Sequence, residues 1–208
     1  MSTDATAIAG ELAALPPAPE PPRRPVLVVG TLLVVAAGTV LIGALLAGYF
    51  SARDLARADG VPWPPEEAIF ANVPLFVGYL TLLMSSFTAQ WAVTALTGRD
   101  RRQMYVAIAL TLVLGLAFVN ALSFALHQLG VAAESSSFAT TVFAVNATHL
   151  ILVVTAHVGF VVMGFRALGG QFSPNDRQLV VAIATYWHFC VAAGLVIWYA
   201  IWFLEGGP

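Results

Sequence analysis

Apolar residues are distributed along the chain in five long stretches, with short polar segments between them. Each stretch exceeds the roughly 20 residues that a helix needs to cross a hydrocarbon core about 30 Å thick. The pattern therefore predicts an all-α integral membrane bundle, with one transmembrane domain over residues 26–205. Its five predicted transmembrane helices are Val26–Ser51, Phe70–Leu96, Gln103–Leu129, Phe138–Leu168 and Asp176–Leu204.

The composition agrees with a chain that lies almost entirely in a bilayer. Hydrophobic residues make up 59% of the 208 residues and charged residues only 10%, whereas a soluble domain carries about 25% charged residues. The single cysteine, Cys190, excludes an internal disulfide and a cysteine-based metal cluster within one chain. No basic block is present, so nothing indicates a nucleic-acid partner.

The first 25 residues differ from the rest of the chain. The segment Leu15–Pro25 is polar and rich in proline, which predicts a disordered tail over residues 1–25. Prolines and arginines stand where a signal peptide would have its apolar region, so we expect no signal peptide.

Arginine placement predicts the orientation of the bundle. Seven arginines fall on the side of the N-terminus, namely Arg23, Arg24, Arg99, Arg101, Arg102, Arg166 and Arg177. Only Arg53 and Arg57 fall on the other side, together with several acids. Because short cytoplasmic loops are enriched in basic residues, we expect the N-terminus in the cytoplasm and the C-terminus outside.

Two local patterns mark the ends of the last helix. The segment Ser173-Pro174-Asn175-Asp176 predicts a helix start, with Ser173 as the N-cap, proline at the first position and an acid at the third. At the other end, aromatic residues are typical of an interfacial belt: Trp198, Tyr199, Trp202 and Phe203.

The polar residues inside the helices limit the possible chemistry. No acid falls in the middle of a predicted helix, which argues against ion translocation by this chain alone. His149 and His188 both fall near mid-membrane, so a small membrane b-type cytochrome with these two haem ligands is one alternative. The other interpretation makes each histidine a hydrogen-bonding link between helices. The other polar residues inside the helices are expected to act in the same way, namely Ser85, Ser86, Thr88, Gln90, Asn120, Ser123, Asn146 and Thr148.

Several short motifs, in order, suggest a family. They are Tyr49-Phe50-Ser51-Ala52-Arg53, Trp63-Pro64-Pro65, Ser85-Ser86-Phe87-Thr88-Ala89-Gln90, Phe172-Ser173-Pro174 and Tyr186-Trp187-His188-Phe189. Over about residues 30–204 the chain resembles subunit III of the haem-copper cytochrome c oxidases, in the short bacterial form with five helices. His149 falls where this family has the first histidine of its penultimate helix.

The resemblance implies an accessory subunit rather than a catalyst. It implies that this chain itself binds no haem, copper or other metal. It also implies that the chain packs against catalytic subunit I and other oxidase subunits, which hold haem and copper, and that it binds phospholipid. The expected location is the bacterial plasma (inner) membrane, in aerobic electron transport. The motif residues expected to have structural roles are Tyr49, Arg53, Ser85, Ser86, Thr88, Gln90, His149, Tyr186, Trp187 and His188. A subunit III-like protein of nitric oxide reductase is a further alternative.

The chain also departs from the pattern that the resemblance leads us to expect. Gly38, Ser123 and Val191 stand where the family often has an acid, and Leu152 replaces a second histidine. These departures identify a divergent member, in which a role based on those carboxylates is not expected.

Overall fold

The computed structural model describes residues 25–173 and 176–206. Most of the predicted N-terminal tail lies outside these residues. Within them the chain forms α2 (Val26–Ala58), α3 (Asn72–Thr97), α4 (Arg101–Gln128), α5 (Ser137–Leu168) and α6 (Gln178–Ile197), and α6 continues through the π-helix η1 (Trp198–Phe203) and α7 (Leu204–Gly206). Among the described residues, five helices are long and apolar enough to cross a membrane, which confirms the predicted all-helical architecture with five candidate spans.

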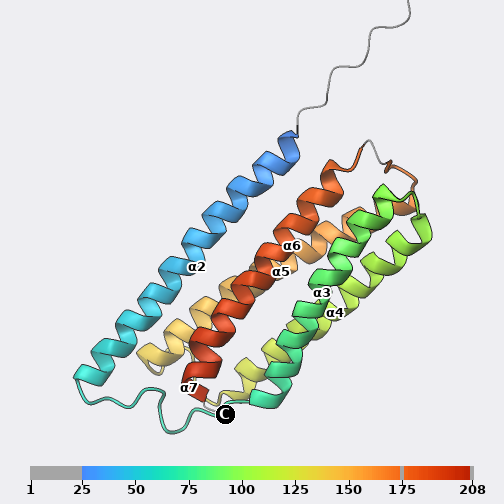
Figure 1. Cartoon of the computed structure of the whole chain (residues 1–208). Coiled ribbons are helices and arrows are strands. Elements are labelled where there is room, and N and C mark those ends of the chain that lie inside the picture. Colours follow the sequence, from blue (N-terminus) through green and yellow to red (C-terminus); the bar gives the residue numbers. More distant parts are fainter. Residues whose placement is uncertain (1–24, 174–175, 207–208) are drawn as a thin grey trace, which may run out of the picture.

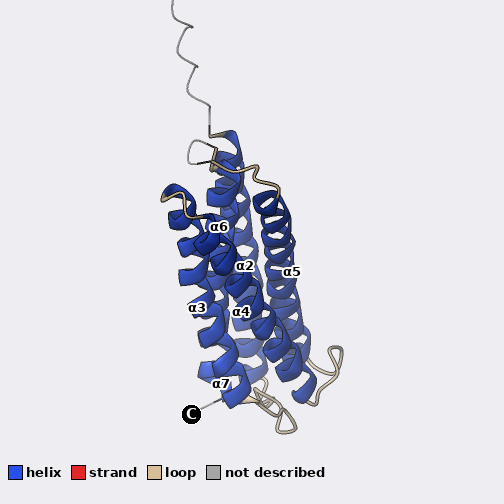
Figure 2. Ribbon diagram, turned by 90° about the vertical axis from the view of Figure 1, so that its right-hand side faces the viewer, coloured by secondary structure: helices blue, strands red, loops and turns tan. Residues whose placement is uncertain are grey.

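The helices lie side by side, with α5 and α6 in the centre (Figure 1). Helix α2 packs against α5 and α6, and the hairpin of α3 and α4 packs against the other sides of the same two helices. The long loop between α2 and α3 lies at the same end of the bundle as α7 (Figures 1 and 2). This arrangement brings the end of α2 and the loop that follows it close to α7, whereas the start of α2 lies at the opposite end of the bundle (Figure 1).

Helix α2 is peripheral, and its sequence explains why. It is apolar on all sides, and its buried residues form one narrow stripe of Gly38, Ile42, Leu46 and Tyr49. A helix that is apolar all round is suited to lipid contact on its free faces. The helix also ends at Ala58 rather than near Ser51, so Arg53 and Arg57 lie on its last turns.

The predicted capping of the last helix is wrong. Helix α6 begins at Gln178 with Arg177 as its N-cap, and no side chain caps it. The Ser173 hydroxyl accepts a hydrogen bond from the backbone N–H of Asp176 at 3.2 Å, so it closes a turn before the helix. Side-chain caps occur instead at α4, where Asp100 accepts from the Gln103 backbone N–H, and at α5, where Ser136 accepts from the Ala139 N–H.

The predicted aromatic belt at the end of α6 is only partly correct. Tyr199 and Phe203 are about half exposed, but Trp202 is 2% exposed and its indole N–H donates to Asn146 Oδ1 at 3.3 Å. The π-helical segment that contains these residues changes the helical register, because each of its turns holds an extra residue. Trp202 therefore faces α5 instead of the membrane interface.

The orientation of the bundle stays a prediction that reporter fusions can test. Fusions after Arg102 and Gly170 should report a cytoplasmic location, because the arginine-rich turns are expected inside. Fusions after Gly60 and Glu134 should report an external location. A cytoplasmic signal at Glu134 would contradict the orientation.

Candidate functional site

The motif residues of α3 and α6 meet in a polar seam, defined here as Ser85, Ser86, Gln90, Trp187 and His188. His188 Nδ1 lies 2.6 Å from Ser86 Oγ, and His188 Nε2 lies 3.3 Å from Gln90 Oε1. A neutral imidazole carries one N–H, so donation from Nε2 to Gln90 leaves Nδ1 to accept from the Ser86 hydroxyl. Positions 86 and 90 are one helical turn apart, which lets both contact one ring.

Trp187 anchors the same seam in the core. Its side chain is fully buried, and its indole N–H donates to Ser85 Oγ at 3.0 Å. The edges of His157 and Phe160 from α5 pack against its ring, with centroids 5.0 and 5.4 Å away. Residues of α3 and α5 thus contact one tryptophan of α6, which fixes the position of α6 along the axis of the bundle.

The remaining hydroxyl of the α3 motif faces α4. Thr88 Oγ1 lies 2.8 Å from Thr111 Oγ1, and Thr111 also donates to the Ala107 carbonyl. Thr111 is fully buried. The motif at residues 85–90 therefore joins α3 to α6 on one side and to α4 on the other.

His149 links α5 to α6 and is fully buried. Its Nε2–H donates to the Cys190 carbonyl at 2.9 Å, and Phe118 packs against the ring at a centroid distance of 5.5 Å. Gly194 makes room for the ring, because a Cβ at that position would lie 2.7 Å from His149 Cε1. The glycine is thus required by the close approach of the imidazole to α6.

The two histidines considered as haem ligands bind different parts of the bundle. His149 bonds to the backbone of α6, whereas His188 bonds to side chains of α3. Among residues 25–173 and 176–206, no group of three or more His, Cys, Asp or Glu side chains could hold a metal ion. The geometry of the seam is that of links between helices.

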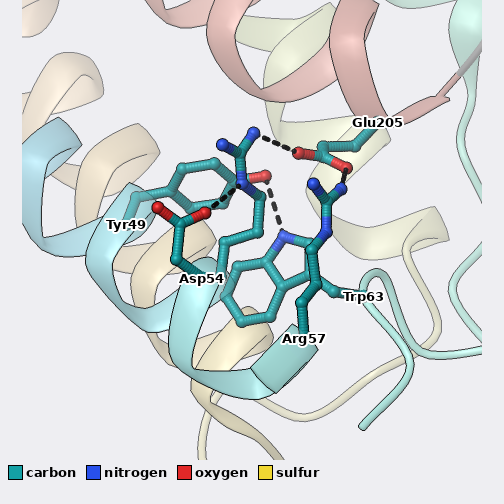
Figure 3. Close-up of polar contacts among 6 residues, drawn as sticks. Tyr49, Asp54, Arg57, Trp63 and Glu205 are labelled. Carbon is teal, nitrogen blue, oxygen red and sulfur yellow. Dashed lines mark hydrogen bonds and ion pairs between the residues drawn. The ribbon is translucent and has the colours of Figure 1, made fainter. Parts of the chain in front are cut away.

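A second group of motif residues lies at the end of the bundle that holds α7 (Figure 3). The indole N–H of Trp63 donates to the Tyr49 hydroxyl at 3.3 Å. Arg53 Nη1 donates to Glu205 Oε1 at 3.2 Å, and Arg57 Nη2 donates to Glu205 Oε2 at 3.3 Å. The Glu205 side chain is only 3% exposed. We call these five residues the terminal clamp, because they tie both α7 and the loop after α2 to the last turns of α2.

Sequence reasoning missed Glu205 in this clamp. It stands one residue beyond the predicted end of the last helix. The signal was present as two arginines four residues apart, Arg53 and Arg57, which share one face of a helix. Their common acceptor lies about 150 residues away in the chain, so spacing alone could not identify it.

Tyr186 and Phe189 complete the α6 motif on the side facing α2. Tyr186 is half-buried and lines an apolar groove of about 430 Å³ between α2, α5 and α6. Phe189 fills the space beside Gly38, where a Cβ would lie 2.6 Å from the phenyl ring. Gly38, where the family often has an acid, therefore lies in the contact between α2 and α6.

Replacing His188 by leucine should weaken the contact between α3 and α6, while glutamine should partly preserve it. The leucine variant loses the bonds to Ser86 and Gln90, and inter-helix hydrogen bonds in bilayers contribute about 0.6–1.7 kcal/mol each. Thermal unfolding in detergent measures the difference. Thr185→Val is the matched control, because that hydroxyl bonds only to the Val181 carbonyl of its own helix. Equal stability of His188→Leu and the control would contradict the role of the seam.

Comparison with known proteins agrees with these motifs. The family model described as cytochrome c oxidase subunit III matches residues 23–205. A probable cytochrome c oxidase subunit 3 of Mycobacterium tuberculosis is 28% identical over 190 residues, covering 88% of this chain and 91% of the relative. The cytochrome c oxidase subunit 3 of Corynebacterium diphtheriae is 28% identical over 188 residues, with the same two coverages.

A longer relative shows the same similarity over part of its length. The probable cytochrome c oxidase subunit 3 of Rickettsia conorii is 27% identical over 181 residues, which cover 81% of this chain and 64% of the relative. The family match itself spans the five long helices, the polar seam and the terminal clamp. The chain therefore belongs to the cytochrome c oxidase subunit III family, and it is a multi-pass membrane protein of the respiratory chain.

Proposed function

We propose that this chain is an accessory subunit of a bacterial haem-copper terminal oxidase, located in the plasma membrane, that stabilises the catalytic subunit without binding a metal. The observation that carries the proposal is the family match over residues 23–205. The relatives from mycobacteria and corynebacteria are themselves named as subunit 3 of cytochrome c oxidase. Haem and copper belong to the partner subunits in this proposal.

The interior of the bundle supports a mechanical role. Its buried polar side chains bond across helix boundaries: Ser85 with Trp187, Asn146 with Trp202 and His149 with the Cys190 carbonyl. Such bonds hold helices at fixed positions where lipid offers no hydrogen-bonding partner. A bundle held in this way presents a rigid surface, which can brace a neighbouring subunit.

The placement of acidic residues favours mechanical support of the catalytic subunit over proton delivery to it. A proton relay at membrane depth needs titratable groups, and Gly38 and Val191 are buried apolar positions at the depth where the family often has acids. At the end of the bundle predicted to face the cytoplasm, Asp100 accepts from the Gln103 backbone N–H and from its side-chain amide at 3.0 and 2.8 Å. That carboxylate is committed to the start of α4.

The apolar grooves beside α2 support lipid binding. One lies between α2, α5 and α6 and has a volume of about 430 Å³. Another of about 260 Å³ lies between α2 and α6, lined by residues that include Ile42, Leu46 and Phe189. Acyl chains of phospholipid match the apolar lining and the membrane depth of both grooves.

An oxidase that lacks this chain distinguishes a role in mechanical support from a role in proton delivery. Oxidase purified from a strain that lacks the chain should complete several-fold fewer turnovers before inactivation, or should be present in smaller amount. The initial rate per intact catalytic centre should change little, even at alkaline pH where proton supply limits turnover. Re-expression of the chain is the control and should restore the turnover count. A large fall in the initial rate that acidic pH reverses would contradict the proposal.

A further inference from the structure

Helix α4 carries polar side chains on the face that no other helix covers. Asn120, Ser123 and His127 are all exposed and follow one another at spacings of three and four residues. At 3.6 residues per turn these spacings place them on one side of the helix. The buried residues of α4, which include Thr111, Phe118, Leu122 and Ala125, occupy the opposite side.

Asn120 lies among apolar side chains of the lipid-facing surface. Val113, Leu116 and Phe124 flank it on the same face and are 64%, 63% and 45% exposed. The hairpin of α3 and α4 lies on the side of the bundle away from α2 (Figure 1). This outer face of α4, defined by Val113, Leu116, Asn120, Ser123 and Phe124, is therefore uncovered in the isolated chain.

The depth of Asn120 makes its exposure costly. It stands eight residues before the end of α4 at Gln128, which is about 12 Å along the axis at about 1.5 Å per residue. A helix of 28 residues is about 42 Å long and overhangs a hydrocarbon core of about 30 Å by roughly 6 Å at each end. The amide of Asn120 thus falls inside the hydrocarbon region, and its short side chain cannot extend to the interface.

Neither Asn120 nor Ser123 has a hydrogen-bond partner within the part of the chain that the structure describes, so the inter-helix bonds expected for them are not formed there. Other lipid-facing hydroxyls bond to their own helix, as Thr39 does to the Val35 carbonyl and Thr155 to the Ile151 carbonyl. An amide cannot be satisfied by lipid tails, and an unsatisfied polar group in hydrocarbon costs several kilocalories per mole. The missing partner must therefore come from outside the described residues.

We propose that the outer face of α4 is a docking surface for a transmembrane helix of another oxidase subunit, which places a hydrogen-bonding side chain opposite Asn120. The partner side chain is a hydroxyl, amide or carboxyl group at the same depth, and Ser123 and Phe124 lie beside it in the contact. The identity of the partner as an oxidase subunit rests on the proposed function. The unsatisfied amide requires a polar transmembrane partner in any case.

The test combines one substitution with one crosslink in the intact complex. Asn120→Leu should weaken retention of the chain in the complex by about three-fold to twenty-fold on detergent titration, the range set by inter-helix hydrogen bonds in bilayers. Thr39→Val is the matched control, since it also removes a lipid-facing polar group but breaks no inter-helix bond. The isolated Asn120→Leu chain should unfold at the same temperature as the unaltered chain or higher.

A photo-crosslinking amino acid at position 120 identifies the helix that binds the outer face of α4. In native membranes it should crosslink to a transmembrane helix of another subunit, which mass spectrometry locates. Crosslinks only to lipid or to a second copy of this chain, or equal retention of Asn120→Leu and Thr39→Val, would overturn the docking surface. If the chain does not purify with a haem-copper catalytic subunit, the proposed function fails, while a crosslink to a different transmembrane protein still supports the docking surface.

Discussion

Replacing Glu205 by glutamine is expected to open the end of the bundle that holds α7. The carboxylate is 3% exposed and accepts from both Arg53 and Arg57. Glutamine removes its negative charge and replaces one accepting oxygen by an NH2 donor, so one of the two guanidinium groups faces a donor instead of an acceptor. Loss of one partner from a buried ion pair costs about 3–5 kcal/mol. Arg57 is 52% exposed, and Arg53 keeps its ion pair with Asp54. We therefore expect Glu205→Gln to lower the free energy of unfolding by about 1–3 kcal/mol.

Thermal unfolding of the detergent-solubilised chain measures this effect. Asp54→Asn is the matched control, because it removes a carboxylate from the same helix end and the side chain is 71% exposed. Exposed pairs contribute about 0–1 kcal/mol, so the control should stay near the unaltered chain. An added protease should also cleave the loop after Ala58 faster in Glu205→Gln, and in that variant alone. Identical behaviour of the two variants would show that the terminal clamp does not hold the bundle together.

Replacing Gly194 by alanine is expected to disrupt the core between α5 and α6. The new Cβ would lie 2.7 Å from His149 Cε1 and 3.0 Å from both His149 Nε2 and Leu82 Cδ2. The imidazole cannot retreat easily, because Phe118 packs against it and its Nε2–H is bonded to the Cys190 carbonyl. Overpacking of a dense core costs about 1–3 kcal/mol, and displacement of the ring also breaks this inter-helix bond.

Gly43→Ala is the matched control for this substitution. Nothing lies within 4 Å of a Cβ at Gly43, and alanine in a helix is favoured over glycine by about 0.5–1 kcal/mol. The control should therefore be as stable as the unaltered chain or more stable, while Gly194→Ala unfolds at a lower temperature. Equal unfolding temperatures for the two variants would contradict the close packing of His149 against α6.

The helices could be predicted from the sequence because bilayer thickness sets a minimum apolar length. Helix α5 ends at Leu168, as expected, and begins within one residue of the prediction. Helix α2 was predicted too short because its charged last turns resemble a loop. Arg53 and Arg57 are helical there and both donate to Glu205, from the far end of the domain.

Local start signals were less informative than apolar length. The Ser173–Asp176 segment has the composition of a helix cap, but the Ser173 hydroxyl closes a turn instead. Asp100 does cap α4, because its carboxylate accepts from the backbone N–H and the side-chain amide of Gln103. The reciprocal bond of a capping box is not formed, since the Asp100 N–H donates to the Ala95 carbonyl.

The candidate site was predicted as a set of residues but not as a set of contacts. The motif at 85–90 and the motif at 186–189 were both identified, and the structure shows that they bond to each other through Ser86, Gln90 and His188. The partner of His149 is a backbone carbonyl, and a carbonyl leaves no trace in the side-chain pattern. Trp202 was misplaced because the π-helix shifts its register by an amount that a regular helix does not predict.

The central claim, that this chain is an accessory subunit of a haem-copper oxidase, is tested most directly by purifying the tagged chain from membranes in mild detergent. We predict that the haem-copper catalytic subunit of a cytochrome c oxidase accompanies it in equal amount. Haem absorbance should follow that subunit, and the chain alone should have no Soret band after the two are separated in harsher detergent. Purification without a haem-copper catalytic subunit, with a nitric oxide reductase instead, or with a Soret band retained by the isolated chain would contradict the account.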